Sequence, residues 1–279
     1  MKLIIVGSTD ILGQELIKQA LDSIEITFIL AIAGPGTDPE LSSHSKLVTS
    51  AIPEKNEEWE RLIIDANGTH ACIWNITPII EEPRDLFGYP DQRKYLNEIG
   101  YGVEWMARRW GANLGNPPPP GVAPLKFIYV SSSHAKKHRS ENTEPTKFSV
   151  QGNAEERVLR CAEDLGGQVQ ACIAKPGHIV RHKTGNVFKE MVHAAGSWVR
   201  DSLTGRLPRV QVEKVAAALL DKAITGNHPE TLFNRDLIKI GEAVLRVPEG
   251  AVTGGGQAEE AGEQGGETNK QAGQTVQNV

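Results

Sequence analysis

The sequence is poor in the features that mark secreted, membrane-spanning and nucleic-acid-binding proteins. It has three cysteines in 279 residues, which is too few for a disulfide framework, and Cys72 and Cys172 have apolar neighbours typical of reduced core positions. No apolar run reaches the length of a membrane span, and Gly7 and Asp10 interrupt the first run too early for a signal peptide. A net charge of −5 gives no general attraction to nucleic acid. These absences predict a cytoplasmic protein with neither nucleic-acid nor membrane partners.

Apolar runs of strand length alternate with helical patterns over most of the chain. Apolar residues make up 39% of the sequence, enough to fill a core. The predicted strands are residues 2–6, 26–32, 46–49, 71–74, 125–130 and 169–174, and the predicted helices are 11–21, 57–64, 91–112, 150–165, 186–199 and 212–224, with a mixed pattern at 237–247. Such alternation predicts an α/β fold with a doubly wound parallel sheet that is covered by helices on both faces.

The composition changes near the end of the chain. Residues 1–248 are predicted to form one domain, with a core at 1–180 and a small substrate-side extension at 181–248. Residues 249–279 are rich in Gly, Gln, Glu, Thr and Ala and have almost no large apolar side chain. Such a segment buries too little surface to offset the loss of chain entropy, so we expect a disordered tail.

The turn after the first strand has the pattern of a dinucleotide-binding turn with one change. Gly7 and Gly13 stand where glycine makes the tight turn and lets helix and strand pack closely, and Thr9 lies between them. Asp10 replaces the glycine that lets the backbone approach a diphosphate. Its carboxylate adds bulk and negative charge at a helix N-terminus that otherwise attracts anions, or it simply caps the helix. Gly7, Thr9 and Gly13 are therefore predicted cofactor contacts in a weakened site.

Five segments follow one another in an order that can be compared with known families: VGSTDILGQELIKQAL, THACIWNITP, KFIYVSSS, VQGNAEERVL and QACIAKPGHI. In this order the chain resembles the atypical short-chain dehydrogenases, most of all the NmrA-related, Tat-interactive-protein-like branch common in fungi. The resemblance implies a Rossmann-like NAD(P)-binding domain, a catalytic Ser near the end of the fifth strand, and a Tyr-x-x-x-Lys pair in the next helix. By this alignment Gln151 stands where Lys belongs and Lys147 where Tyr belongs.

The cofactor side of the resemblance is degenerate too. Residues 33–36 read AGPG, where proteins of this family hold the NADP 2′-phosphate with Arg, and residues 49–51 read TSA, where they often have an acid. Because several separate positions depart from the family pattern, we expect no cofactor. If the protein is instead an oxidoreductase, NADP is the expected cofactor.

Polar residues are predicted to gather at the carboxyl ends of the strands, where such sheets take their ligands. The predicted catalytic residues are Asp10, Ser132, His134, Gln151 and His178, and the predicted substrate-binding residues are Asn75, Thr77, Lys147 and Lys175. No metal is expected, since the pairs His134/His138 and His178/His182 lie in loops without an HExxH context.

This set of acids, bases and hydrogen-bond donors suits proton-driven chemistry on a small organic molecule. We therefore expect a cofactor-independent enzyme, an isomerase or cyclase that rearranges its substrate or opens an epoxide. The resemblance implies a role in fungal secondary-metabolite biosynthesis and a homodimer formed through residues 91–112. Two alternatives stay open: an NADP-dependent oxidoreductase, and a non-catalytic NmrA-like regulatory or binding protein.

Overall fold

The computed structural model describes residues 1–32, 43–51, 58, 62, 68–76, 102, 123–136, 147–181, 208–226 and 229–246. The chain divides into two units, Met1–Arg246 and Val247–Val279, and every described residue belongs to the first unit. The predicted tail at 249–279, the predicted helix at 186–199, and most of the predicted helices at 57–64 and 91–112 therefore lie outside the described residues. The domain boundary and the homodimer stay predictions.

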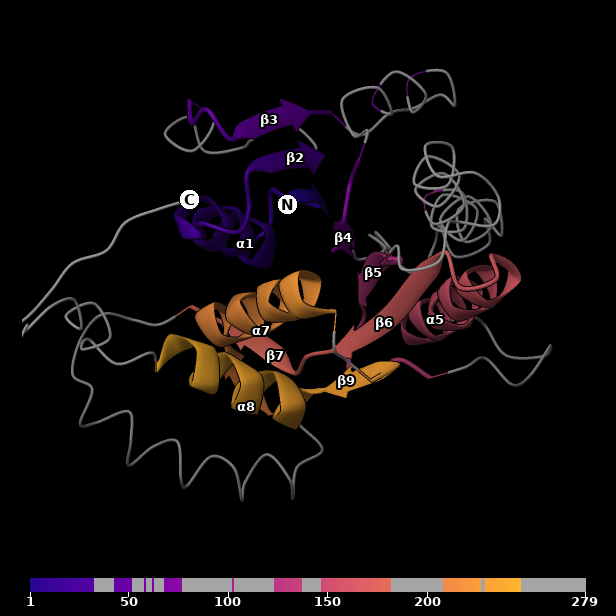
Figure 1. Cartoon of the computed structure of the whole chain (residues 1–279). Coiled ribbons are helices and arrows are strands. Elements are labelled where there is room, and N and C mark those ends of the chain that lie inside the picture. Colours follow the sequence, from indigo (N-terminus) through magenta and orange to yellow (C-terminus); the bar gives the residue numbers. More distant parts are fainter. Residues whose placement is uncertain are drawn as a thin grey trace, which may run out of the picture. The chain divides into compact units, whose positions relative to one another are not determined.

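A seven-stranded parallel sheet is the centre of the first unit (Figure 1). Its strand order is β3-β2-β1-β4-β5-β6-β9. The strands are β1 (Lys2–Val6), β2 (Phe28–Ile32), β3 (Leu47–Ser50), β4 (Ala71–Trp74), β5 (Leu125–Val130), β6 (Val169–Lys175) and β9 (Thr231–Phe233). The order reverses direction between β1 and β4, which is the switch point of a Rossmann-like sheet. The predicted α/β fold with a doubly wound parallel sheet is confirmed.

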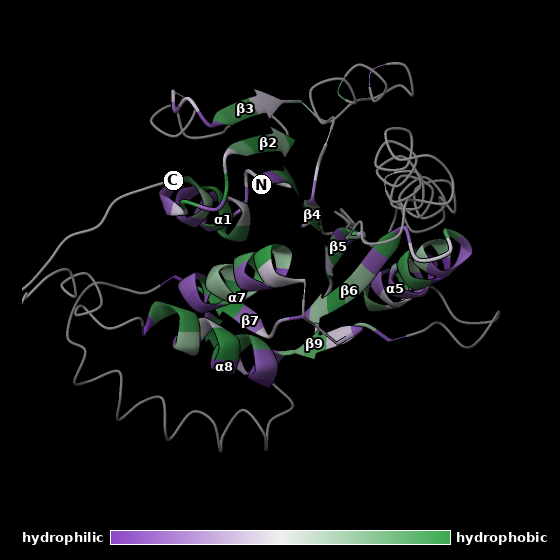
Figure 2. Cartoon of the chain, viewed as in Figure 1, coloured by the Kyte–Doolittle hydropathy of each residue, from purple (hydrophilic) through white to green (hydrophobic). Residues whose placement is uncertain are grey.

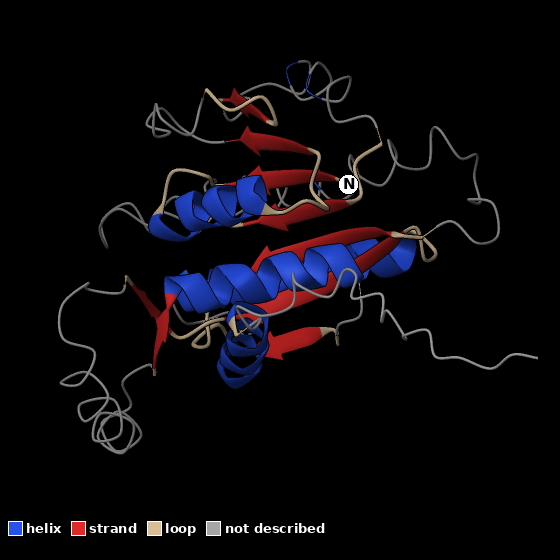
Figure 3. Cartoon of the chain, turned by 60° about the vertical axis from the view of Figure 1, so that its left-hand side comes forward, coloured by secondary structure: helices blue, strands red, loops and turns tan. Residues whose placement is uncertain are grey.

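Helices cover both faces of this sheet, as Figure 3 shows for the described part of the chain. Helices α1 (Ile11–Asp22), α7 (Val212–Thr225) and α8 (Asn234–Leu245) contribute to one apolar cluster, and α5 (Lys147–Asp164) contributes to the other. Successive strand residues point to opposite faces, so Ile5 joins the first cluster and its neighbours Ile4 and Val6 join the second. Burial on both sides explains why β2 is an unbroken apolar run and why β1 has four apolar residues after Lys2 (Figure 2).

The structure departs from the sequence-based expectation after β6. The chain forms a small two-stranded parallel sheet, β7 (His178–Val180) with β8 (Arg209–Gln211), and the short β9 extends the main sheet. Each of these strands has three residues, too few to show a period of two. The mixed pattern expected at 237–247 is a regular helix, α8, whose first turn is closed by the side chain of Asp236 accepting from the Phe233 N–H. Within the described ranges, no helix combines the length and apolar character needed to cross a membrane.

Helices α7 and α8 approach so closely at Gly241 that a side chain is excluded there. A Cβ on Gly241 would lie 2.1 Å from the backbone oxygen of Lys214. Next to this contact, the Lys214 ammonium pairs with the Glu242 carboxylate at 2.7 Å. The pairing holds the Glu242 pKa below its ordinary value.

We therefore expect Gly241→Ala to destabilise the protein by about 1–3 kcal/mol through overpacking. This cost outweighs the gain of about 0.5–1 kcal/mol that Ala normally brings to a helix interior. Urea unfolding followed by circular dichroism measures the change. Lys239→Ala, at an exposed position two residues earlier on the same helix, is the control and should stay within about 0.5 kcal/mol of the parent. A Gly241→Ala protein more stable than the parent would contradict the close contact.

Candidate functional site

The opening turn, residues 7–10, connects β1 to α1 at the switch point of the sheet. Gly7 has a φ of 85°, and a Cβ on it would lie 2.2 Å from the backbone oxygen of Asn75. A Cβ on Gly13 would lie 2.3 Å from the backbone oxygen of Gly7. Both positions therefore require glycine, the first for its conformation and both for space. These are the two glycine roles that the sequence pattern predicted for the turn.

Asp10 is the N-cap of α1, which is one of the two roles open to it from the sequence. Its Oδ1 accepts hydrogen bonds from the Gly13 N–H at 2.6 Å and from Nδ2 of Asn75 at 2.8 Å. The same Nδ2 is 3.3 Å from the backbone oxygen of Gly7, so Asn75 joins the cap to the turn. Two predicted site residues, Asp10 and Asn75, are thus brought into contact.

The surroundings of the Asp10 carboxyl group alter its acidity. Burial raises its pKa above the ordinary value, and the hydrogen bonds from Gly13 and Asn75 only partly offset this effect. The residue as a whole is nonetheless exposed, so the burial concerns the carboxyl end near the turn. Asp10 therefore holds a proton more readily than an ordinary aspartate. Its predicted role as a catalytic acid stays a prediction.

Ser8 adds a buried polar atom to the opening turn. Its side chain is 0% exposed, and its Oγ has no hydrogen-bond partner within the described part of the chain. Its backbone lies directly between the two glycines, since a Cβ on Gly13 would also come within 2.6 Å of the Ser8 Cα. A buried hydroxyl without a partner costs free energy, and a ligand atom is one way to satisfy it.

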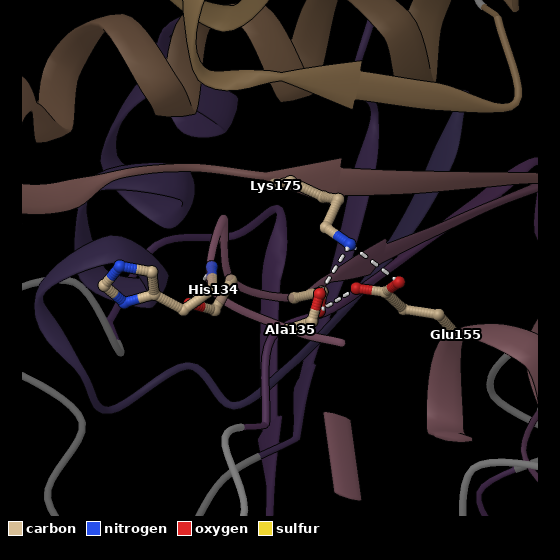
Figure 4. A network of polar contacts seen from close by, with 6 residues as sticks. His134, Ala135, Glu155 and Lys175 are labelled. Carbon is tan, nitrogen blue, oxygen red and sulfur yellow. Dashed lines mark hydrogen bonds and ion pairs between the residues drawn. The ribbon is translucent and has the colours of Figure 1, made fainter. Parts of the chain in front are cut away.

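A second polar cluster lies at the carboxyl ends of β5 and β6, and Figure 4 shows it from close by. The Glu155 carboxylate, from α5, accepts from Ser131 Oγ at 2.5 Å and from Lys175 Nζ at 2.8 Å. Lys175 Nζ also donates to the backbone oxygen of Ala135 at 3.3 Å. The Lys175 and Glu155 side chains are only 15% and 16% exposed. The predicted substrate contact Lys175 is therefore already paired within the chain.

This ion pair holds the serine loop, residues 131–135, at both ends. Between the ends, Ser132 Oγ accepts from the His134 N–H at 3.2 Å, and the Ser133 N–H donates to the Pro176 oxygen at 3.1 Å. The His134 ring meets the Phe148 ring edge-on, with centroids 5.1 Å apart. Ser132 and His134, two predicted catalytic residues, are thus presented together by a fixed loop.

The other predicted site residues are more scattered. Gln151 is buried in α5, at 4% exposure, and Lys147 is the first residue of that helix. His178 is exposed at the start of β7, where its N–H donates to the Pro208 oxygen at 3.0 Å. Thr9 offers its backbone oxygen to Gln14 Nε2 at 3.4 Å. Thr77 and residues 33–36 lie outside the described residues.

Sequence reasoning missed Glu155, the residue that joins the second cluster. One signal was available, because Glu155 lies four residues after Gln151 in the QGNAE segment and i, i+4 residues share a helix face. Its partners are Ser131, directly after β5, and Lys175, the last residue of β6, and that pairing depends on the order of β5 and β6 in the sheet.

The comparisons with known proteins bear on the fold. No family model matches the chain, and no curated protein matches it. Among solved structures, it resembles DesIV, a dTDP-glucose 4,6-dehydratase from Streptomyces venezuelae with NAD bound, at 11% identity and a TM-score of 0.52 over 88% of this chain and 81% of that one. It also resembles WbmF of Bordetella bronchiseptica in complex with NAD+, at 14% identity and a TM-score of 0.52 over 89% and 79% of the two chains.

A third solved structure is a short-chain dehydrogenase from Burkholderia cenocepacia J2315 in complex with NADP, at 17% identity and a TM-score of 0.51 over 88% and 93% of the chains. The likeness shows a Rossmann-like α/β fold, and both the resemblance to short-chain dehydrogenases and the narrower NmrA-related branch stay predictions. The expectation of a protein without a cofactor is wrong on this comparison, because these three similar structures were solved with NAD, NAD+ and NADP.

The Glu155 cluster yields a stability prediction. Glu155→Gln removes the charge that pairs with the largely buried Lys175, so we expect a loss of about 1–3 kcal/mol in the free energy of unfolding. Glu156→Gln is the matched control: it makes the same change at the next residue, whose pair with Arg160 at 2.9 Å is exposed, and should cost less than about 0.5 kcal/mol. Equal costs for the two variants in urea unfolding would show that the cluster does not hold the loop.

The raised pKa of Asp10 predicts a pH dependence. The folded protein binds this proton more readily than the unfolded chain does, so ionisation of Asp10 lowers stability as the pH rises from its ordinary pKa, about 3.9, through the raised folded value. Asp10→Asn keeps a capping side chain and removes the titration. Its free energy of unfolding should therefore improve relative to the parent from about pH 3 to about pH 7.

Asp22→Asn is the control for this pH series, because it makes the same charge change at an exposed position on the other end of α1. Chemical unfolding at several pH values measures both variants. If the parent instead becomes more stable relative to Asp10→Asn as the pH rises, the hydrogen bonds from Gly13 and Asn75 outweigh the effect of burial on the Asp10 pKa.

Proposed function

We propose that this chain binds a nicotinamide adenine dinucleotide at its opening turn and is an oxidoreductase that acts on a small organic molecule. The observation that carries the proposal is the backbone at Gly7 and Gly13, where no side chain fits. The turn lies at the switch point between β1 and β4, where sheets of this kind take dinucleotides. The dinucleotides in the similar dehydratase and dehydrogenase structures support the same reading.

The residues of the turn fit this group. The two glycines let the turn pack closely against β4 and α1, because backbone atoms of Asn75 and Gly7 already occupy the space that a Cβ would take. The buried Ser8 hydroxyl has no partner among the described residues, and a phosphate oxygen could satisfy it. Gly7, Ser8, Thr9 and Gly13 are the residues that would hold the nucleotide. The Asp10 carboxylate disfavours binding of the nucleotide. It already accepts a hydrogen bond from the Gly13 N–H, and it places a negative charge near the diphosphate.

The nucleotide, when bound, supplies or accepts a hydride. The chain itself has to hold and move the accompanying proton. His134 is the residue that we assign to this task, with Ser132 as its neighbour on the serine loop, since imidazole is the side chain most often used as a general acid or base and the loop is fixed at both ends. Gln151 cannot take over the role of the lysine that it replaces, because an amide side chain carries no ionisable proton near neutral pH.

A proton-driven isomerase or cyclase that keeps the nucleotide bound is the second candidate. Two observations favour it: the buried amide of Gln151 at the position of the expected lysine, and an Asp10 carboxyl group whose pKa is raised. Such an enzyme would transfer protons within its substrate without net oxidation. A product with the mass of its substrate, formed without a change in nicotinamide absorbance, distinguishes this function from the first.

The test of the proposal is titration of the purified protein with NADPH and with NADH, followed by calorimetry and tryptophan fluorescence. We expect a dissociation constant of about 1–100 μM for at least one of them. Asp10→Asn should bind about 3- to 10-fold more tightly, since it removes a like charge beside the diphosphate. Asp22→Asn should bind as the parent does. No binding of either nucleotide at millimolar concentration by the folded protein would overturn the proposed function.

A further inference from the structure

A cation from the segment that follows β7 is held against the first turn of α1. Arg181, the residue after β7, donates from Nη2 to Oε1 of Gln14 at 2.8 Å, across 167 positions in the chain. Gln14 belongs to that first turn, because its N–H donates to the Asp10 backbone oxygen at 3.0 Å. Its own Nε2 is 3.4 Å from the Thr9 oxygen. The guanidinium group is therefore held, through one side chain, beside the opening turn.

The path of the chain after β6 accounts for this position of Arg181. The Gly177 N–H donates to Oδ1 of the buried Asn234 at 2.7 Å. A Cβ on Gly177 would lie 1.9 Å from the Pro208 oxygen, so the chain passes that residue without room for a side chain. The register of β7 with β8 then fixes the following residues up to Val180. The contacts of Gly177 and the pairing of β7 with β8 thus place Arg181 next to α1.

The charges at the opening turn create a need for such a cation. Asp10 places a carboxylate at the N-terminus of α1 and uses the Gly13 N–H that an anion would otherwise reach. A diphosphate bound here therefore requires positive charge from elsewhere in the fold. Ser8, which is completely buried in this turn and has no hydrogen-bond partner within the described ranges, independently points to a ligand at the same place.

The guanidinium group suits that need. Arginine carries five N–H donors in a planar fork that matches phosphate oxygens. Gln14 is its one partner among the described residues, and the Arg181 side chain is otherwise exposed. We infer that Arg181 binds the diphosphate of the nicotinamide nucleotide and offsets the charge of Asp10. The inference rests on the proposed function and assigns to its binding site the residue that follows β7, outside the glycine turn.

The experiment compares Arg181→Gln, Arg181→Lys and the parent protein in titrations with NADH and with NADPH. Arg181→Gln should weaken the binding of both nucleotides by about 10- to 100-fold, because a charge-assisted hydrogen bond is lost. Arg181→Lys keeps the charge without the fork and should recover about half of that loss on a logarithmic scale. Raising the salt concentration should weaken binding to the parent more than binding to Arg181→Gln.

Arg209→Gln is the matched control, since it removes an equally exposed arginine from the neighbouring strand β8. It should bind both nucleotides as the parent does, and thermal unfolding should show that all variants are folded. Parent-like affinity of Arg181→Gln would overturn the inference and leave the proposed function intact. A loss confined to NADPH would also overturn it, because Arg181 would then read the 2′-phosphate. Failure of the parent to bind either nucleotide would instead refute the proposed function.

Discussion

The backbone of Gly7 lies so close to β4 that a Cβ would come within 2.2 Å of the Asn75 oxygen. Much of the site follows from this contact. It brings the end of β1 against the end of β4, so that the Asn75 amide reaches both the Gly7 oxygen and the Asp10 carboxylate. The matching contact at Gly13 seats α1 directly on the turn. Any side chain at either glycine would separate the helix from the sheet at the point where the strand order reverses.

Asp10 serves the stability of this turn and opposes its use for binding an anion. A carboxylate that caps a helix satisfies N–H groups that would otherwise be available to a phosphate. Its partial burial has a further consequence, since the ionised form is disfavoured and the group is easier to protonate. A site with this residue depends on charges from other elements of the fold, and Arg181 is held next to the same turn of helix. The negative charge of Asp10 and the nearby positive charge of Arg181 thus come from segments far apart in the sequence.

The sequence predicted the central strands closely because burial on both faces leaves little freedom in their residue types. Residues 71–74 and 125–130 were predicted to the residue as β4 and β5. The three-residue strands β7, β8 and β9 leave no periodic trace, and they were missed. The cofactor prediction failed for another reason: it weighed side chains at Asp10, at residues 33–36 and at residues 49–51, whereas the shape of the opening turn depends on the backbone at Gly7 and Gly13. The contact between Gln14 and Arg181 could not be predicted, because only the folded backbone brings the two together.

The pair of Glu155 with Lys175 changes how the second polar cluster should be understood. Viewed in the sequence alone, Lys175 is a cation at the end of a strand and a natural substrate contact. In the fold its ammonium group donates to the Glu155 carboxylate and to the Ala135 oxygen (Figure 4). The same carboxylate accepts a hydrogen bond from the Ser131 hydroxyl. A largely buried ion pair gains little net stability, because desolvation offsets most of the attraction. Its effect is geometric, because it ties both ends of the serine loop to one carboxylate. Ser132 and His134 therefore have a defined position beyond the carboxyl end of β5.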